Sequence, residues 1–78
     1  MKILSEFGVR VDLLDDQDRD TRPGVVADVY PFEEDKTVSI TVFSTYIDIC
    51  GSSQFSPLSA RRFARAINIA CRVLESGA

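Results

Sequence analysis

The sequence predicts an α+β fold, a small antiparallel sheet of three or four strands with one long C-terminal helix packed across one face. Two observations predict it. Alternation of apolar and polar residues, typical of half-buried strands, recurs between residues 5 and 50. A single segment with helical periodicity follows over residues 57–75. Because the strands all precede the helix, a helix laid across the sheet buries both apolar surfaces in the simplest way.

Four strands are predicted, at 5–14, 25–31, 37–43 and 46–50. Residues 15–24 lack apolar core residues and end in Pro23-Gly24, a strong turn signal, so they predict an acidic loop. Two alternatives stay open for residues 37–50. They form either a hairpin that turns at Ser44 and Thr45 or one long strand bent at Ser44.

The C-terminal helix has recognisable start and stop signals. Ser56 is a good N-cap, because its hydroxyl can accept a free backbone N–H of the first turn. Pro57 then takes the first helical position, where its missing N–H costs nothing. Gly77 is placed to end the helix in a left-handed conformation. The predicted helix covers about 28 Å.

Composition argues against an enzyme or a metalloprotein. The 78 residues make one domain with a thin core, and they contain no histidine. The two cysteines, Cys50 and Cys71, form no C-x-x-C pair and lie in apolar patterns, so we expect buried free thiols. The usual general base and the common zinc ligand sets are therefore missing. The four glycines are scattered, which excludes a glycine-rich phosphate loop. We expect no catalytic residue, no cofactor and no metal.

One acidic pattern partly matches a calcium-binding loop. Asp16, Asp18 and Asp20 have the spacing that opens an EF-hand loop. Thr21 stands where that loop needs glycine, and Ala27 stands where it needs a bidentate glutamate. A solvated loop is the favoured interpretation.

The N-terminus shows no charged-then-apolar signal segment, and no run of about eighteen apolar residues could cross a membrane. We therefore expect an intracellular, cytoplasmic protein that makes no contact with membranes.

The helix has two apolar strips when it is projected at about 100° per residue. The broader one is predicted to face the sheet and contains Ala60, Phe63, Ala64, Ile67, Ala70, Cys71 and Leu74. The narrower one lies among arginines on the opposite face. It defines a candidate interface of Leu58, Arg61, Arg62, Arg65, Ile69, Arg72 and Val73.

This candidate interface predicts a non-enzymatic protein-interaction module. A second copy is the expected partner, because dimerisation adds burial that a small monomer lacks, and another protein is the alternative. Nucleic acid is disfavoured. Residues 57–78 carry four Arg and one Glu, but residues 1–56 carry five basic and eleven acidic side chains that would repel phosphates. A nucleic-acid-binding module that uses the arginine face is a lesser alternative.

Residues 55–67, which read Phe-Ser-Pro-Leu-Ser-Ala-Arg-Arg-Phe-Ala-Arg-Ala-Ile, resemble the ending of short actinobacterial and phage-encoded proteins. In those proteins a β-hairpin leads into a Ser-Pro-capped helix rich in Ala and Arg. The resemblance implies a compact single domain and assigns no functional residue. This chain differs in having Leu58-Ser59 where acidic residues are common. A further alternative is a phage or mobile-element modulator that binds and inhibits a host protein.

Overall fold

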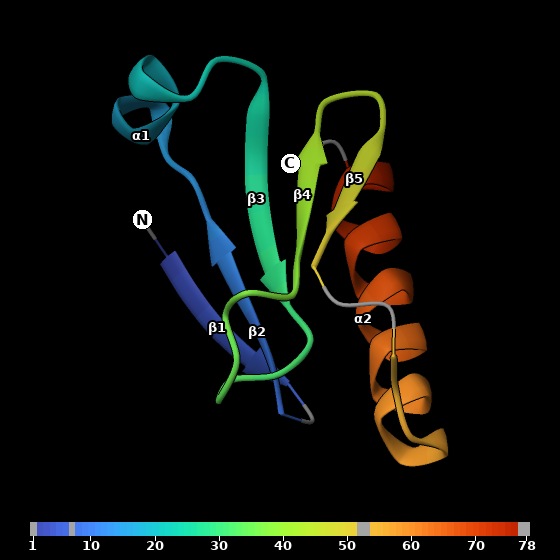
Figure 1. Ribbon diagram of the computed structural model, residues 1–78. Helices are drawn as coiled ribbons and strands as arrows, with labels where there is room; N and C mark the ends of the chain where they lie inside the picture. Colours follow the sequence, from blue (N-terminus) through green and yellow to red (C-terminus); the bar gives the residue numbers. More distant parts are fainter. Residues whose placement is uncertain (1, 7, 52–53, 77–78) are drawn as a thin grey trace.

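The computed structural model describes residues 2–6, 8–51 and 54–76, except for the side chain of Arg19. It is an antiparallel sheet with a long C-terminal helix across one face (Figure 1), which confirms the predicted α+β class. Within these described residues the sheet has five strands, so the predicted number of three or four is wrong. The elements in chain order are β1 (Lys2–Glu6), β2 (Val9–Leu13), α1 (Asp16–Thr21), β3 (Val25–Tyr30), β4 (Ser39–Phe43), β5 (Ile47–Cys50) and α2 (Pro57–Glu75).

The five strands form a simple meander, in which each strand pairs with the next one along the chain. The prediction of one strand over 5–14 is wrong, because the chain reverses within that range. Glu6 lies opposite Val9, and Gly8 has a φ of 77°. A positive φ is easy for glycine and allows a tight hairpin connection. The alternating pattern runs on through Gly8, so it hid this turn.

The open question about residues 37–50 is settled in favour of a hairpin. The Phe43 backbone N–H donates to the Tyr46 carbonyl at 2.8 Å, which closes the turn. The two aromatic rings stack with their centroids 4.5 Å apart. β4 and β5 then pair with Val42 opposite Ile47 and Ile40 opposite Ile49.

The acidic segment is partly helical, so the prediction of a loop throughout 15–24 is wrong. The Asp15 carboxylate accepts the Asp18 backbone N–H at 2.8 Å, and the Asp18 carboxylate accepts the Asp15 backbone N–H at 3.3 Å. This reciprocal capping box stabilises the first turn of α1. α1 therefore has a capping box but no apolar stripe. Because an apolar stripe is the feature by which a helix is recognised in a sequence, α1 was not predicted.

α2 has the predicted bounds, and its N-terminal cap is confirmed. Ser56 Oγ accepts the Ser59 backbone N–H at 3.2 Å, and Pro57 stands at the start of the helix. At the other end, the Ser76 backbone N–H donates to the Arg72 carbonyl at 3.0 Å. The prediction that Gly77 ends the helix lies outside the described residues. In the part of the chain that the structure describes, neither helix has the length and apolar character needed to cross a bilayer.

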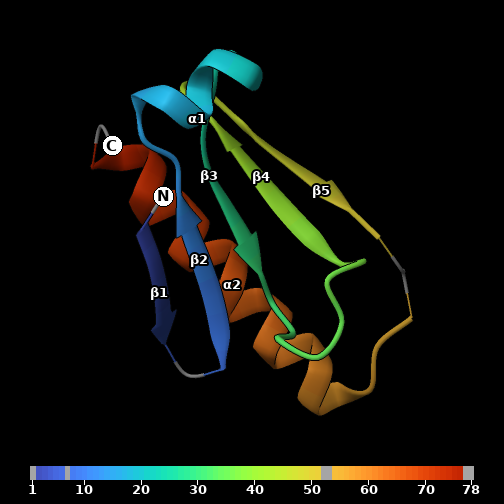
Figure 2. The ribbon, with the colours of Figure 1, turned by 90° about the vertical axis from the view of Figure 1, so that its left-hand side faces the viewer.

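The core lies between α2 and the sheet. Turned by 90°, the molecule shows α2 running obliquely behind the strands (Figure 2). Ala66 and Ala70 are fully buried, so the helix backbone can lie close to β3 and β4. The buried residues that pack together are Val9, Val11, Val26, Ala27, Val29, Ile40, Val42, Ala66, Ile69 and Ala70.

The core-facing side of α2 differs from the predicted one. Ile69, placed on the outer face by the sequence, is only 5% exposed. Ala60 and Ala64, placed on the core face, are exposed. Relative to the predicted orientation, α2 is rotated about its axis, because the small side chains of Ala66 and Ala70 let that side of the helix lie against the sheet. Phe63 stacks instead on Phe55, with the ring centroids 5.1 Å apart.

The cysteines also differ from expectation. Cys50 is exposed and Cys71 is half-buried, so the prediction of two buried thiols is wrong. Cys50 ends the edge strand β5, where it pairs with Ser39 of β4 and has a strand on one side only.

Candidate interaction surface

The apolar strip predicted on the outer face of α2 is not assembled there. Leu58 is 75% exposed in the first turn of the helix. Ile69 is buried, and Val73 is half-buried against the core. Leu58 and Ile69 are separated by about 16 Å along the helix axis. The three apolar residues therefore do not form one exposed patch.

The predicted arginines have different surroundings. Arg62 lies with its guanidinium 5.3 Å from the centre of the Phe32 ring, donates to the Gly8 carbonyl at 3.2 Å and donates to Glu34 Oε1 at 3.3 Å. The pKa of Glu34 lies below its usual value, first because its own backbone N–H bonds the carboxylate and then because of Arg62. Arg62 thus ties the start of α2 to two turns of the sheet. Arg61 and Arg65 are exposed.

Three of the predicted residues do come together, in a groove between β1 and the C-terminal half of α2. Ile69 and Val73 contribute apolar side chains from the helix, and Arg72 Nη2 reaches Glu6 Oε1 of β1 at 3.8 Å. The groove has a volume of about 210 Å³ and is lined by Leu4, Glu6, Val11, Ile69, Arg72, Val73 and Ser76. We call it the β1–α2 groove.

β1 forms the other part of this surface. It stands at the edge of the sheet, and all five of its residues are exposed. Ile3 is 53% exposed and Leu4 is 43% exposed. An edge strand presents unpaired backbone N–H and C=O groups to any strand that approaches. We define β1 together with the β1–α2 groove as the β1 surface.

Sequence reasoning missed the β1 half of this surface. Residues 2–4 were assigned to no element, so neither Ile3 nor Leu4 entered the candidate interface. A signal was present in Gly8, because glycine readily adopts a positive φ and can reverse the chain. Reading that glycine as a hairpin turn would have separated β1 from β2.

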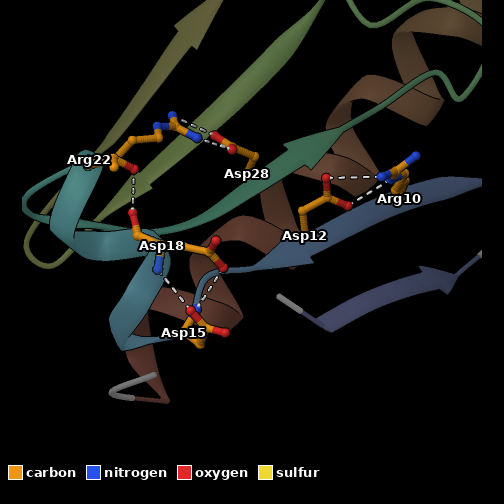
Figure 3. Close-up of polar contacts among 7 residues, drawn as sticks. Arg10, Asp12, Asp15, Asp18, Arg22 and Asp28 are labelled. Atoms are coloured by element: carbon orange, nitrogen blue, oxygen red, sulfur yellow. Dashed lines mark hydrogen bonds and ion pairs between the residues drawn. The ribbon is translucent and has the colours of Figure 1, made fainter.

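The face of the sheet opposite α2 has a different character (Figure 3). Asp12 and Asp28 lie directly opposite each other on β2 and β3, and both are buried. Arg10 donates to both oxygens of Asp12, at 2.7 and 3.2 Å. Arg22, just after α1, donates to both oxygens of Asp28. Each carboxylate is thus held in a bidentate pair.

This network is suited to holding strands together. Two like charges opposite each other in a sheet repel, and the two arginines offset that repulsion. The pKa of the neighbouring Tyr30 is raised, first by burial and then by the Asp28 and Asp12 charges.

A second hollow, of about 280 Å³, lies near the start of α2. Its lining is Phe32, Glu34, Asp35, Val38, Gln54, Phe55 and Ser59. Two of these lining residues, Phe32 and Phe55, pack against each other, with their tilted ring centroids 5.7 Å apart.

Within residues 2–6, 8–51 and 54–76, no three or more Cys, Asp or Glu side chains gather as a metal site would require. Asp16, Asp18 and Asp20 all lie in α1, and Asp18 contributes to its capping box. Comparison of the chain with protein-family models, with curated proteins and with solved structures finds no match.

Proposed function

We propose that this protein is a non-enzymatic protein-interaction module that forms a homodimer through the β1 surface. The observation behind the proposal is an edge strand whose five residues are all exposed and which borders an apolar groove. Such a surface combines unpaired backbone groups with apolar side chains that gain from leaving water.

The size of the domain favours self-association. A chain of 78 residues buries a smaller share of its surface than a larger domain does, so added burial has a large relative effect. Leu4 lies opposite Val11 in the sheet and borders the groove. A partner that covers Leu4 would extend the apolar contacts that already involve Ile69 and Val73.

The solution mass tests this proposal. Light scattering on the wild-type chain should give twice the chain mass of 8.7 kDa. Leu4→Glu should give the monomer mass, because it introduces a charge at the centre of the proposed contact. A wild-type chain that stays monomeric at millimolar concentration contradicts the proposal.

Leu58→Glu is the matched control for the same change of residue type. Leu58 is exposed and belongs to α2, but it is not among the residues that line the β1–α2 groove. We expect this variant to stay dimeric. If Leu58→Glu dissociates the dimer and Leu4→Glu does not, the contact lies on the outer side of α2.

A further inference from the structure

β1 has a length and a sequence that suit pairing with a second copy of itself. It is five residues long, Lys-Ile-Leu-Ser-Glu, with Leu4 at its centre. When two antiparallel copies of such a strand align, the register that pairs all five residues places Leu4 opposite Leu4. Any other symmetric register leaves part of each strand unpaired.

In this full-length register the charges are complementary. Lys2 lies opposite Glu6 of the second copy, and the two-fold symmetry repeats the pair at the other end. Opposite charges that face each other across strands are favourable, whereas like charges are unfavourable. Ile3 lies opposite Ser5 of the second copy on the other face. The strand is therefore self-complementary.

The same register brings the apolar grooves together. Leu4 lies opposite Val11 in the sheet, and both line the β1–α2 groove. A two-fold axis through the Leu4 pair, perpendicular to the sheet, keeps both α2 helices on one face. The two grooves then meet at the paired Leu4 side chains, and Ile69 and Val73 of each copy border the joint apolar surface.

The other edge of the sheet lacks this complementarity. β5 has four residues, Ile-Asp-Ile-Cys, and Asp48 is their one charged side chain. No antiparallel pairing of β5 with its own copy can join opposite charges. The two edges therefore differ, and β1 is the edge that fits a second copy.

Resting on the proposed homodimer, we propose that two copies join by antiparallel β1–β1 pairing with Leu4 opposite Leu4. The two five-stranded sheets then become one continuous sheet. The Lys2–Glu6 pairs select the register and the partner. This arrangement is strand addition at a free edge, with side-chain charges supplying the specificity.

Charge exchange tests the pairing. Lys2→Glu places two glutamates opposite each other at both ends of the interface, and Glu6→Lys places two lysines there. Each single variant should dimerise roughly ten- to thirty-fold more weakly than the wild type at low salt. The Lys2→Glu/Glu6→Lys double variant restores opposite charges, so its dimer affinity should return close to that of the wild type.

Mixing the two single variants gives the sharpest readout. A Lys2→Glu chain against a Glu6→Lys chain has opposite charges at both ends, so the mixture should form a heterodimer more readily than either variant pairs with itself. Native mass spectrometry separates the species if one variant is isotopically labelled. Circular dichroism of each variant shows whether it is folded.

The contact that Glu6 makes within its own chain, with Arg72 Nη2 at 3.8 Å, is separated from the contact across β1 by repeating the charge exchange in an Arg72→Ala background. If the Lys2–Glu6 pairs act across the interface, each charge variant should weaken dimerisation by about the same factor with and without Arg72. If the charge variants dimerise as the wild type does, and the mixture shows no preference for the heterodimer, the β1 register is wrong while the homodimer stands. A monomeric wild type overturns the homodimer itself.

Discussion

Asp15 is the residue on which the first turn of α1 depends. Its carboxylate accepts the Asp18 backbone N–H, and this hydrogen bond is the largest of several causes that lower the pKa of Asp15 to about 2 from an ordinary value of 3.8. Since α1 has no apolar stripe, the charged cap is an important part of what holds the helix.

The pH dependence of this cap has a definite sign. Because the pKa of Asp15 is lowered in the folded chain, the cap stabilises α1 fully above pH 3.8, and its contribution is lost as the pH falls toward about 2. NMR titration of the Asp15 carboxyl carbon should give the lowered midpoint, and the α1 amide signals should change in step with it.

Asp15→Asn provides the control, because asparagine caps a helix without ionising. In this variant the α1 amide signals should lose the part of their pH response that Asp15 causes. A carboxyl midpoint near 3.8 in the wild type would mean that the carboxylate does not cap α1 in solution.

The two caps show what local sequence can predict at this scale. Ser56 and Asp15 perform the same chemistry, but only Ser56 was predicted as a cap. Ser56 precedes a long segment with apolar periodicity, whereas Asp15 precedes six polar residues. A capping residue is recognisable when a helix is already expected after it, and a short polar helix gives no such expectation.

At the scale of elements, the rotation of α2 about its axis decides which residues support the fold. Amphipathic periodicity located the helix and its bounds, but it did not select the buried side among neighbouring orientations. The orientation follows from Ala66 and Ala70, whose small size seats the helix on β3 and β4. That fit depends on the shape of the sheet, which a helical projection does not contain.

This orientation predicts a large difference between two substitutions to aspartate. Ile69→Asp places a charge in the core beside Val11 and should destabilise the fold by more than about 3 kcal/mol. Leu58→Asp changes an exposed side chain and should alter the free energy of unfolding by no more than about 0.5 kcal/mol. Urea denaturation followed by circular dichroism measures both.

Equal destabilisation by the two substitutions would mean that Ile69 faces solvent as Leu58 does. The sequence placed both residues on one outer strip, and from that interpretation similar effects would follow. The pair of variants therefore separates the observed orientation of α2 from the predicted one.

At the scale of the whole molecule, the order of strands followed by a helix was enough to predict the α+β class. The candidate interaction surface was predicted only in part. Ile69, Arg72 and Val73 were named, but the surface that they border also needs Leu4 and Glu6 of β1. These residues become neighbours only when β1 folds back beside β2 and α2 crosses the sheet. Such proximity is a property of topology.

Self-association couples folding to concentration. A homodimer is favoured by mass action, so its thermal unfolding midpoint should rise by a few degrees for each tenfold increase in protein concentration. Differential scanning calorimetry over a hundredfold range of concentration measures this shift. Leu4→Glu should unfold at one temperature throughout that range, and a wild type that does the same would speak against a dimer.

The unlike edges of the sheet also bear on where assembly stops. A contact between β1 and its own copy is isologous, so each chain uses its β1 once and both outer edges of the joined sheet are β5. β5 is short and carries Asp48, features that discourage strand addition. Gly51 follows β5 directly. A side chain at this position would be too close to its neighbours, because a Cβ atom would lie 2.7 Å from the Thr37 carbonyl oxygen. Growth into fibres would need a second edge strand that pairs with another copy. In this fold β1 is such a strand, whereas β5 resists strand addition.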